Sequence, residues 1–244
     1  DVAALNAELT SLRDQFIWAP GRIVWDDPAA IEQGIVEGRM AEALFRKIRT
    51  LQSELLIESA YFVTQDKAVG VVKQLHEKGV RIRVLTNSLA SNDVVAAHAG
   101  HAKRREQLIE AGLELYEYRP DSLISKTRAY RGESKAALHT KAIVFDRESV
   151  FIGSFNLDPR SAAINTEAGL YVESPELARQ VIEYMDEGVQ PENAYRVLLD
   201  EEGDLYWMTE VDGNEVRYYE EPLTTFGQRF MSGFIMILPV EHQL

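Results

Sequence analysis

The 244-residue sequence contains no cysteine, which excludes disulfide bonds and thiolate metal sites. It also has no run of about 20 apolar residues, the length that a membrane-spanning helix needs. Basic residues are scarce, because 26 Lys and Arg stand against 39 Asp and Glu, for a formal net charge of −13. This charge argues against non-specific nucleic-acid binding but leaves a local basic patch open. The remaining composition, 45% hydrophobic and 27% charged, is typical of a globular protein.

The chain begins with Asp1 rather than Met, and we expect it to be a processed or truncated piece of a longer protein. Its composition suggests three parts. These are an N-terminal helix or linker at residues 1–21, a main domain at 22–190, and a C-terminal extension at 191–244 that packs on this domain. Apolar residues at helical spacing over 1–18 favour a helix packed on the core over one lying at a membrane surface.

Apolar strands and amphipathic helices alternate through the middle of the chain. Apolar runs predict strands at 55–59, 80–85 and 113–118, and helical periodicity predicts helices at 66–78 and 94–111 between them. This β-α-β-α-β order predicts an α/β fold. We expect a mixed, largely parallel β-sheet flanked by helices on both faces.

The rest of the chain is predicted to contain shorter elements. The polar residues 119–137 are expected to form a loop, after which 138–145 and 150–153 form paired strands. An apolar stretch at 225–240 is too short to span a membrane. It predicts either a C-terminal helix packed on the core or an interfacial segment that reaches lipid, and core packing is favoured because most apolar stripes face the core.

Polar side chains on and after the paired strands can converge on an anion. Residues two apart on a strand share a face, so His139 and Lys141 are predicted to point the same way. An ammonium neutralises the non-bridging oxygens of a phosphodiester, while an imidazole attacks phosphorus or moves a proton. Ser154 and Asn156 follow the next strand and can bind phosphate oxygens, and Gly153 lets the backbone come close.

Glu167 and two further histidines complete the candidate set. The carboxylate of Glu167 can accept a hydrogen bond from the far ring nitrogen of His139 and fix its tautomer. His98 and His101 share a helix face, but no third metal ligand is evident, so we expect surface or cleft-lining residues. Each candidate alone has a simpler structural explanation, such as a core histidine or a turn. Their joint spacing favours phosphodiester chemistry.

These residues fit a known signature. The pattern H-x-K-x4-D, followed after six residues by G-S-x-N, resembles that of the phospholipase D superfamily. The resemblance covers nearly the whole chain, is weakest over residues 1–20, and makes the chain look like the C-terminal half of a bacterial C-type cardiolipin synthase. The matching residues are His139, Lys141, Asp146, Gly153, Ser154 and Asn156, and Glu167 stands where the family places the glutamate that orients its histidine.

The resemblance implies a mechanism that needs two imidazoles. In this family one histidine attacks phosphorus to give a phosphohistidine, and the other protonates the leaving alcohol and then deprotonates the incoming hydroxyl. His139 begins the only copy of the motif in this chain, which implies one half of a pseudo-dimer with His139 as the general acid/base. The resemblance also implies that Asp146 braces the motif. It implies no metal or other cofactor, because lysines and amides supply the positive field.

The expected function is therefore cardiolipin synthase-like phosphatidyl transfer between phospholipids. The expected partners are the phospholipid substrate, an N-terminal half with a second motif or a second copy of this chain, and a membrane surface; nucleic acid is not expected. The resemblance implies a bacterial protein peripheral to the cytoplasmic membrane. Two alternatives stay open: a phospholipase or nuclease-type phosphodiesterase acting as a homodimer, and a folded but inactive half-enzyme when isolated.

Overall fold

The computed structural model describes residues 2, 5, 6, 10, 16–35, 39–128 and 137–238. The helix expected at 1–18, the loop expected at 119–137 and the end of 225–240 lie partly outside these residues. The described strands are β1 (Gly21–Trp25), β2 (Glu54–Ser59), β3 (Arg81–Asn87), β4 (Leu113–Tyr118), β5 (Lys141–Phe145), β6 (Ser149–Gly153), β7 (Ala168–Glu173), β8 (Ala194–Leu199), β9 (Leu205–Val211) and β10 (Asn214–Tyr218). The described helices are α2 (Pro28–Glu32), α3 (Met40–Ile48), α4 (Asp66–Glu77), α5 (Val95–Ala102), α6 (Arg105–Glu110), α7 (Leu123–Arg128), α8 (Pro159–Ala163), α9 (Pro175–Gly188) and α10 (Phe226–Ile237).

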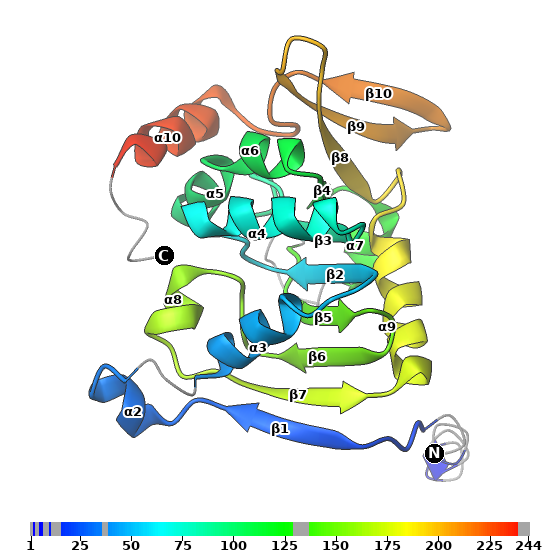
Figure 1. Ribbon diagram of the computed structural model, residues 1–244. Coiled ribbons are helices and arrows are strands. Elements are labelled where there is room, and N and C mark those ends of the chain that lie inside the picture. The colour runs from blue at the N-terminus through cyan, green and yellow to red at the C-terminus, as the bar shows by residue number, and fades with distance from the viewer. Residues whose placement is uncertain are drawn as a thin grey trace.

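One ten-stranded sheet runs through the described part of the chain, in the order β1-β7-β6-β5-β2-β3-β4-β8-β9-β10 (Figure 1). The strands β2, β3 and β4 are parallel, as the alternation of strands and helices predicts. The other seven pairings are antiparallel, so the expected mixed sheet is confirmed but its largely parallel character is wrong. Short connections explain the difference, because strands joined by tight turns, such as β5 and β6 or β9 and β10, return antiparallel.

Helices cover both faces of the sheet, as expected. Neighbouring residues of β2 divide between the two layers: Leu55 and Ile57 face α3, α4 and α6, whereas Leu56 faces α9. On the second face, Ile182 and Met185 of α9 pack against the central strands. Burial of apolar area in two layers is the main driving force for this arrangement.

Two expectations for helices need correction. The helix expected at 94–111 is broken into α5 and α6, because Arg104 leaves the helical conformation. Its buried guanidinium donates to the Asp66 carboxylate at 2.7 Å and to the Thr64 carbonyl at 3.0 Å, so a tertiary contact overrides a continuous helix. The polar segment 119–137, expected to be a loop, contains α7 within its described residues.

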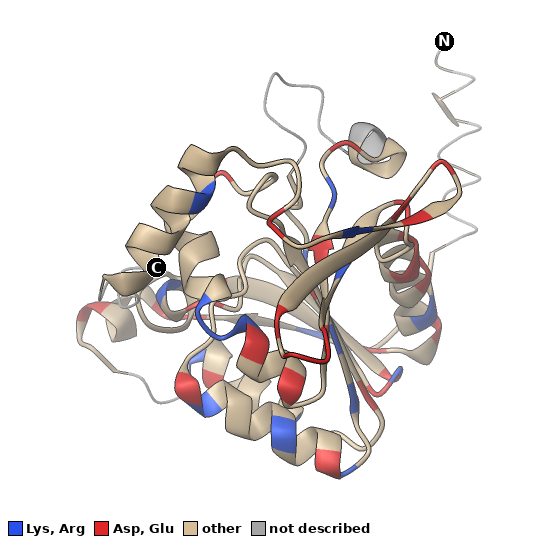
Figure 2. Ribbon diagram, turned by 90° about the horizontal axis from the view of Figure 1, so that it is seen from above, with Lys and Arg blue, Asp and Glu red and all other residues tan. Residues whose placement is uncertain are grey.

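The helix α10 packs against α5 at one end of the molecule, but its large apolar side chains do not enter the core. The core packing favoured for this stretch is therefore wrong; the only buried residue of α10 is Ser232. Seen from above, α10 carries a single charged residue, whereas α4 and α9 carry several (Figure 2). Among the described helices, none has both the length and the apolar content to cross a bilayer.

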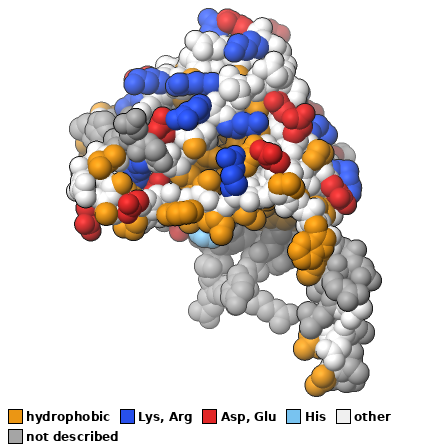
Figure 3. All heavy atoms as spheres, turned by 60° about the horizontal axis from the view of Figure 1, so that its bottom comes forward, with side chains coloured by type: hydrophobic (Ala, Val, Ile, Leu, Met, Phe, Trp, Pro, Cys, Tyr) orange, Lys and Arg blue, Asp and Glu red, His pale blue; other side chains and the backbone are white. Residues whose placement is uncertain are grey.

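Despite the negative net charge, one side of the molecule carries many basic side chains. Figure 3 brings the edge that carries β1 forward and shows Lys and Arg side chains there, among hydrophobic and acidic ones. The last turn of α3 also carries two basic residues, Arg46 and Lys47. A net charge calculated over the whole chain therefore does not describe every surface of this protein.

Candidate active site

The candidate site lies where β2 and β3 end and β5 begins. The buried side chain of Asn87, the last residue of β3, holds this corner together. Its Nδ2 donates to the carbonyls of Ala60 at 3.0 Å and Leu138 at 2.9 Å, and its Oδ1 accepts from the Leu138 backbone N–H at 2.9 Å. Asn87 thus fixes the residue immediately before His139 and acts as a positioning residue, a role that the sequence did not reveal.

His139 and Lys141 follow Leu138 at this corner. The strand β5 begins only at Lys141, so His139 stands just before it rather than on it as expected. The half-buried Lys141 Nζ donates to the His139 carbonyl at 2.9 Å, and the His139 side chain is exposed. Burial lowers the pKa of Lys141, while the carboxylates of Glu167, Asp158 and Asp93 act in the opposite direction. The Lys141 ammonium is therefore a partly desolvated cation, which an added anion would stabilise.

Ser154 and Glu167 are brought together beside this pair. Ser154 follows β6, and its hydroxyl donates to the buried Glu167 carboxylate while accepting from the Ala168 N–H at 3.0 Å. Asn165 Nδ2 donates to the other carboxylate oxygen of Glu167 at 3.3 Å. Within the described residues no hydrogen bond joins Glu167 to the His139 ring, so the orienting role of Glu167 stays a prediction.

Glu167 is anchored through its backbone by a residue far away in the sequence. The buried Asp26 accepts from the Glu167 N–H at 3.2 Å, and its own N–H donates to the Glu167 carbonyl at 2.9 Å. The second carboxylate oxygen of Asp26 accepts from the N–H of Met40, the first residue of α3, at 2.9 Å. A carboxylate at a helix N-terminus is favourable, so Asp26 ties α3 to the site.

Gly153 and Asn156 serve different purposes in this structure. A Cβ atom at Gly153 would lie 2.4 Å from the Ala168 carbonyl oxygen and 2.7 Å from the Cα of Gly169. Close packing of β6 on β7 over the Phe151 ring therefore already requires Gly153, whether or not a phosphate approaches its backbone. Asn156 keeps its Oδ1 buried with no hydrogen-bond partner among the described residues, an acceptor available to a donor on a bound molecule.

Asp146 lies at the far end of β5 from Lys141 and takes no part in the cluster around His139. Its carboxylate accepts hydrogen bonds from the backbone N–H groups of Gln52 at 3.1 Å, Ser53 at 2.8 Å and Glu54 at 3.0 Å. Although partial burial opposes the shift, these donors lower the pKa of Asp146 below its usual value of 3.8. Asp146 thus joins the start of β2 to the β5–β6 turn, consistent with the predicted bracing role.

Replacing Asp146 by Asn should weaken this brace without changing its shape. Because water reaches the carboxylate, we expect the free energy of unfolding at neutral pH to fall by only about 1 kcal/mol. The folded-state pKa lies below the unfolded value of 3.8, so the stabilisation is complete above pH 3.8 and disappears as the pH falls through the folded-state pKa. Urea unfolding of both proteins should therefore show a difference at pH 7 that shrinks in strong acid; a difference that is constant with pH would contradict the charge argument.

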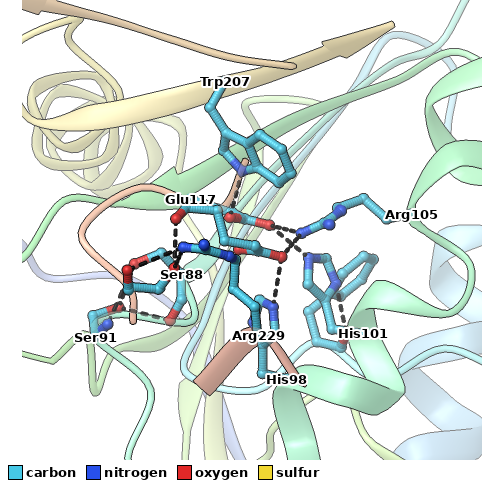
Figure 4. A network of polar contacts seen from close by, with 11 residues as sticks. Ser88, Ser91, His98, His101, Arg105, Glu117, Trp207 and Arg229 are labelled. Atoms are coloured by element: carbon cyan, nitrogen blue, oxygen red, sulfur yellow. Dashed lines mark hydrogen bonds and ion pairs between the residues drawn. The ribbon is translucent and has the colours of Figure 1, made fainter. Parts of the chain in front are cut away.

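A second polar cluster, buried beneath α5 and α6, contains the histidines that were expected at the surface or in a cleft (Figure 4). That expectation is wrong, because the exposed fraction is 0% for His98 and 3% for His101. The ring of His98 contacts the Glu221 carboxylate at 3.0 Å, and that of His101 contacts Glu117 at 3.3 Å. Among the described residues no group of three or more His, Cys, Asp or Glu could hold a metal ion.

Arg105 links the two carboxylates of this cluster. Its guanidinium donates to Glu117 at 2.8 Å and to Glu221 at 2.9 Å, and it lies over the Trp207 ring, 4.7 Å from its centroid. Trp207 Nε1 in turn donates to Glu117 at 2.8 Å. Burial acts against ionisation, but the charge of Arg105 holds the pKa of Glu117 well below its usual range. The cluster joins α5, α6 and β4 to β9 and to the segment that precedes α10.

Comparison with known proteins identifies the family of this chain. Residues 44–188 match the family described as "Cardiolipin synthase, PLD-like domain". Cardiolipin synthase C of Escherichia coli is 40% identical over 229 residues, which cover 92% of this chain and 48% of that protein. The cardiolipin synthase of Alkalihalophilus pseudofirmus is 28% identical over 130 residues, covering 52% of this chain and 22% of that one. The chain thus spans about half the length, or less, of these relatives.

Solved structures share the fold at low sequence identity. A phospholipase D family member, Nuc from Salmonella typhimurium, superposes with a TM-score of 0.53 at 17% identity, covering 73% of this chain and 99% of that one. Phosphatidylserine synthase of Haemophilus influenzae gives a TM-score of 0.53 at 16% identity, covering 70% of this chain and 38% of that one. The α/β fold of this chain is therefore shared with these proteins.

Proposed function

The chain belongs to the family of cardiolipin synthase PLD-like domains, and we propose that it is one catalytic half of an enzyme that transfers a phosphatidyl group between phospholipids. The observation that supports the proposal is that Lys141, which donates to the His139 carbonyl, lies close enough to Glu167 and its partner Ser154 for the Glu167 carboxylate to oppose the lowering of the Lys141 pKa by burial. The half-buried ammonium suits a phosphodiester, and the exposed imidazole is free to exchange a proton with solvent or substrate.

In the proposed reaction, His139 handles the protons. A histidine from the second half attacks phosphorus and forms an N–P bond, while His139 donates its proton to the oxygen of the leaving alcohol as the P–O bond breaks. His139 then accepts the proton of the incoming hydroxyl, whose oxygen displaces the histidine. Lys141 offsets the negative charge that develops on the non-bridging oxygens, and the Nδ2 amide of Asn156 donates to them, so the proposal calls on no metal ion. Ser154, whose hydroxyl proton goes to Glu167 in this structure, donates to them only after turning away from that carboxylate.

The second half needs a surface on which to dock. Three exposed apolar residues from neighbouring strands, Ile23, Leu170 and Ile152, stand in register across β1, β7 and β6 and form what we call the edge stripe. On β6, Ile152 lies two residues before Ser154. On β7, Leu170 lies three residues after Glu167. Because the E. coli relative is about twice as long as this chain, we assign the stripe to contact with the second half, or with a second copy in its place.

This proposal predicts that one chain alone cannot catalyse the reaction. A monomer of these 244 residues is expected to fold but not to cleave a chromogenic phosphodiester, because one imidazole cannot be nucleophile and acid at once. Activity should appear when a half with a second H-x-K-x4-D motif is co-expressed. Analytical ultracentrifugation combined with the phosphodiesterase assay, and with phosphatidyl transfer in mixed micelles, tests this.

Variants of the edge stripe sharpen the experiment. Leu170→Arg should weaken association with the second half and lower activity in parallel, whereas Phe234→Ser, an exposed apolar change on α10, should not affect association. Robust turnover by a proven monomer would contradict the two-imidazole argument. Hydrolysis without transfer by a dimer of this chain would replace the proposal with that of a homodimeric phosphodiesterase.

We further propose that the protein works at a membrane surface, as a peripheral protein of the bacterial cytoplasmic membrane. We also propose that the chain consists of an N-terminal helix or linker at residues 1–21, a catalytic domain at 22–190 and a C-terminal extension at 191–244. The strands β8 to β10 extend the sheet beyond β4, which supports a C-terminal extension packed directly on the catalytic part.

A further inference from the structure

The helix α10 exposes large apolar side chains and buries a polar one, the reverse of a helix that packs on a protein core. Its buried residue is the polar Ser232, with an exposed fraction of 5%. Phe226, Phe230 and Ile237 are 74%, 63% and 84% exposed. Together with the exposed Phe234 they lie at intervals of four, four and three residues, so they share one face, which we call the phenylalanine face. A soluble domain does not normally leave such a row of large apolar side chains in water.

The helix does not need this face to hold its place. Its opposite side packs on α5, which offers small buried residues such as Ala97 and Gly100 and allows close approach. A capping box between Thr225 and Gln228 fixes the first turn. Arg229 donates to the Thr224 carbonyl at 3.1 Å and lies 2.9 Å from the Glu220 carboxylate. The fold therefore positions α10 rigidly while presenting the phenylalanines outward.

The charge around this face differs from that of the rest of the chain. Residues 222–238 contain no acidic residue and a single basic one, Arg229, although the whole chain has a net charge of −13. In Figure 2 α10 is accordingly almost free of charged residues. A protein-binding surface is normally rimmed by polar and charged side chains. An apolar face cleared of negative charge matches the surface of a phospholipid bilayer, which is often anionic.

The helix also lies at the edge of the molecule that carries the catalytic residues. In Figure 1, α5, α8 and α10 lie on the left, the edge at which β2 ends and β5 begins. The connection can be followed through contacts: Asn87 binds Leu138 next to His139, the segment after Asn87 leads into α5, and α10 packs on α5. A surface resting on the phenylalanine face would thus lie on the side of the protein from which substrate must reach His139.

We propose that α10 lies in the interface of a phospholipid bilayer, with the phenylalanine face inserted among the upper acyl chains. This rests on the proposed function only in naming a phospholipid as the substrate. Burial of the stacked Phe226 and Phe230 rings, 6.2 Å apart, supplies the driving force, and electrostatic attraction adds little because only one cation is present. Binding should therefore be hydrophobic and largely insensitive to salt.

Sedimentation with sucrose-loaded vesicles tests the proposal without turnover. The chain should sediment with both phosphatidylcholine and phosphatidylglycerol vesicles, and added NaCl should change this little. The double change Phe230→Ser and Phe234→Ser should lower the partition coefficient at least about tenfold, since two phenylalanine side chains lose their burial. Phe230→Leu with Phe234→Leu should keep most of the binding. Leu123→Ser, a change of an apolar residue that is 79% exposed on α7 and lies outside both the phenylalanine face and the edge stripe, is the control and should bind like the unchanged protein.

The outcomes separate this proposal from the proposed function. Thermal unfolding should be unchanged in the serine variant, because both phenylalanines are exposed. Turnover of a soluble phosphodiester by the assembled enzyme should also be unchanged, while turnover of phospholipid in vesicles falls. Equal vesicle binding by the serine variant, or binding that salt abolishes, would overturn the assignment. A change in oligomeric mass without a change in vesicle binding would overturn it too, because α10 would then be a protein contact.

Discussion

Replacing His139 by Ala is expected to lower turnover of the assembled two-motif enzyme by about 10²–10⁴-fold, the loss that follows removal of a proton-transfer group. His139 is exposed, Asn87 holds the backbone of the preceding Leu138, and Lys141 donates to the His139 carbonyl, so the fold should not depend on the His139 ring. The effect should therefore appear in kcat and leave the thermal unfolding temperature unchanged.

The matched control is His76→Ala, which removes an imidazole from the last turn of α4, away from the site. This variant should turn over the substrate at the normal rate. If His139→Ala retained normal activity, the proton-transfer role would be wrong; if it lost activity together with its fold, the exposure argument would be wrong. The pH dependence of turnover adds a further check. The change in rate that reports the titration of the general acid should be absent in His139→Ala.

The second large effect is expected in the buried cluster. Glu117→Ala should lower the free energy of unfolding by about 3–5 kcal/mol, because it leaves the guanidinium of Arg105 buried with one carboxylate instead of two. The change also removes the partner of Trp207 Nε1 and of the His101 ring. Chemical denaturation with a tryptophan signal would measure it, since Trp207 reports directly on the cluster.

Two further variants test the cause. Glu183→Gln breaks an exposed pair with Arg179 on α9 and should change stability by less than about 0.5 kcal/mol. The double change Glu117→Met and Arg105→Met removes both charges, so it should recover part of the stability lost in Glu117→Ala. A loss in Glu117→Ala no larger than that in Glu183→Gln would show that the buried charges are not coupled.

Strands and helices near the parallel centre of the sheet were predictable, because apolar periodicity is a local signal. The strands β2, β3 and β4 and the helix α4 appear close to the expected positions. Strand direction beyond that region was not predictable, because a run such as 168–173 reads the same whether its neighbour is parallel or antiparallel. The break at Arg104 was also hidden, since its cause is a contact with Asp66, 38 residues earlier.

The candidate site shows the same division. The spacing of His139, Lys141 and Ser154 predicted a shared site. In the structure Lys141 donates to the His139 carbonyl and Ser154 donates to Glu167. These contacts join residues near in the sequence or on neighbouring strands, so a local pattern was enough to suggest them. The clamp by Asn87 and the anchoring of Glu167 by Asp26 could not be read from the sequence. The second of these links residues 141 positions apart. A short polar side chain after a strand suggests a binding loop and gives no hint of such a distant partner.

The order of strands places the signature residues on β5 and β6, which have hydrogen-bonded neighbours on both sides, while the unpaired edges fall to β1 and β10. The opening of an edge strand costs little free energy. A strand with neighbours on both sides exchanges its amide protons with solvent only when a larger part of the fold opens. Lys141 at the start of β5 and Ser154 after β6 are thus attached to strands whose amide protons we expect to exchange more slowly than those of β1 and β10. Under the proposed function, motion at the edges of the sheet can accommodate a partner without disturbing the spacing between Lys141 and Ser154.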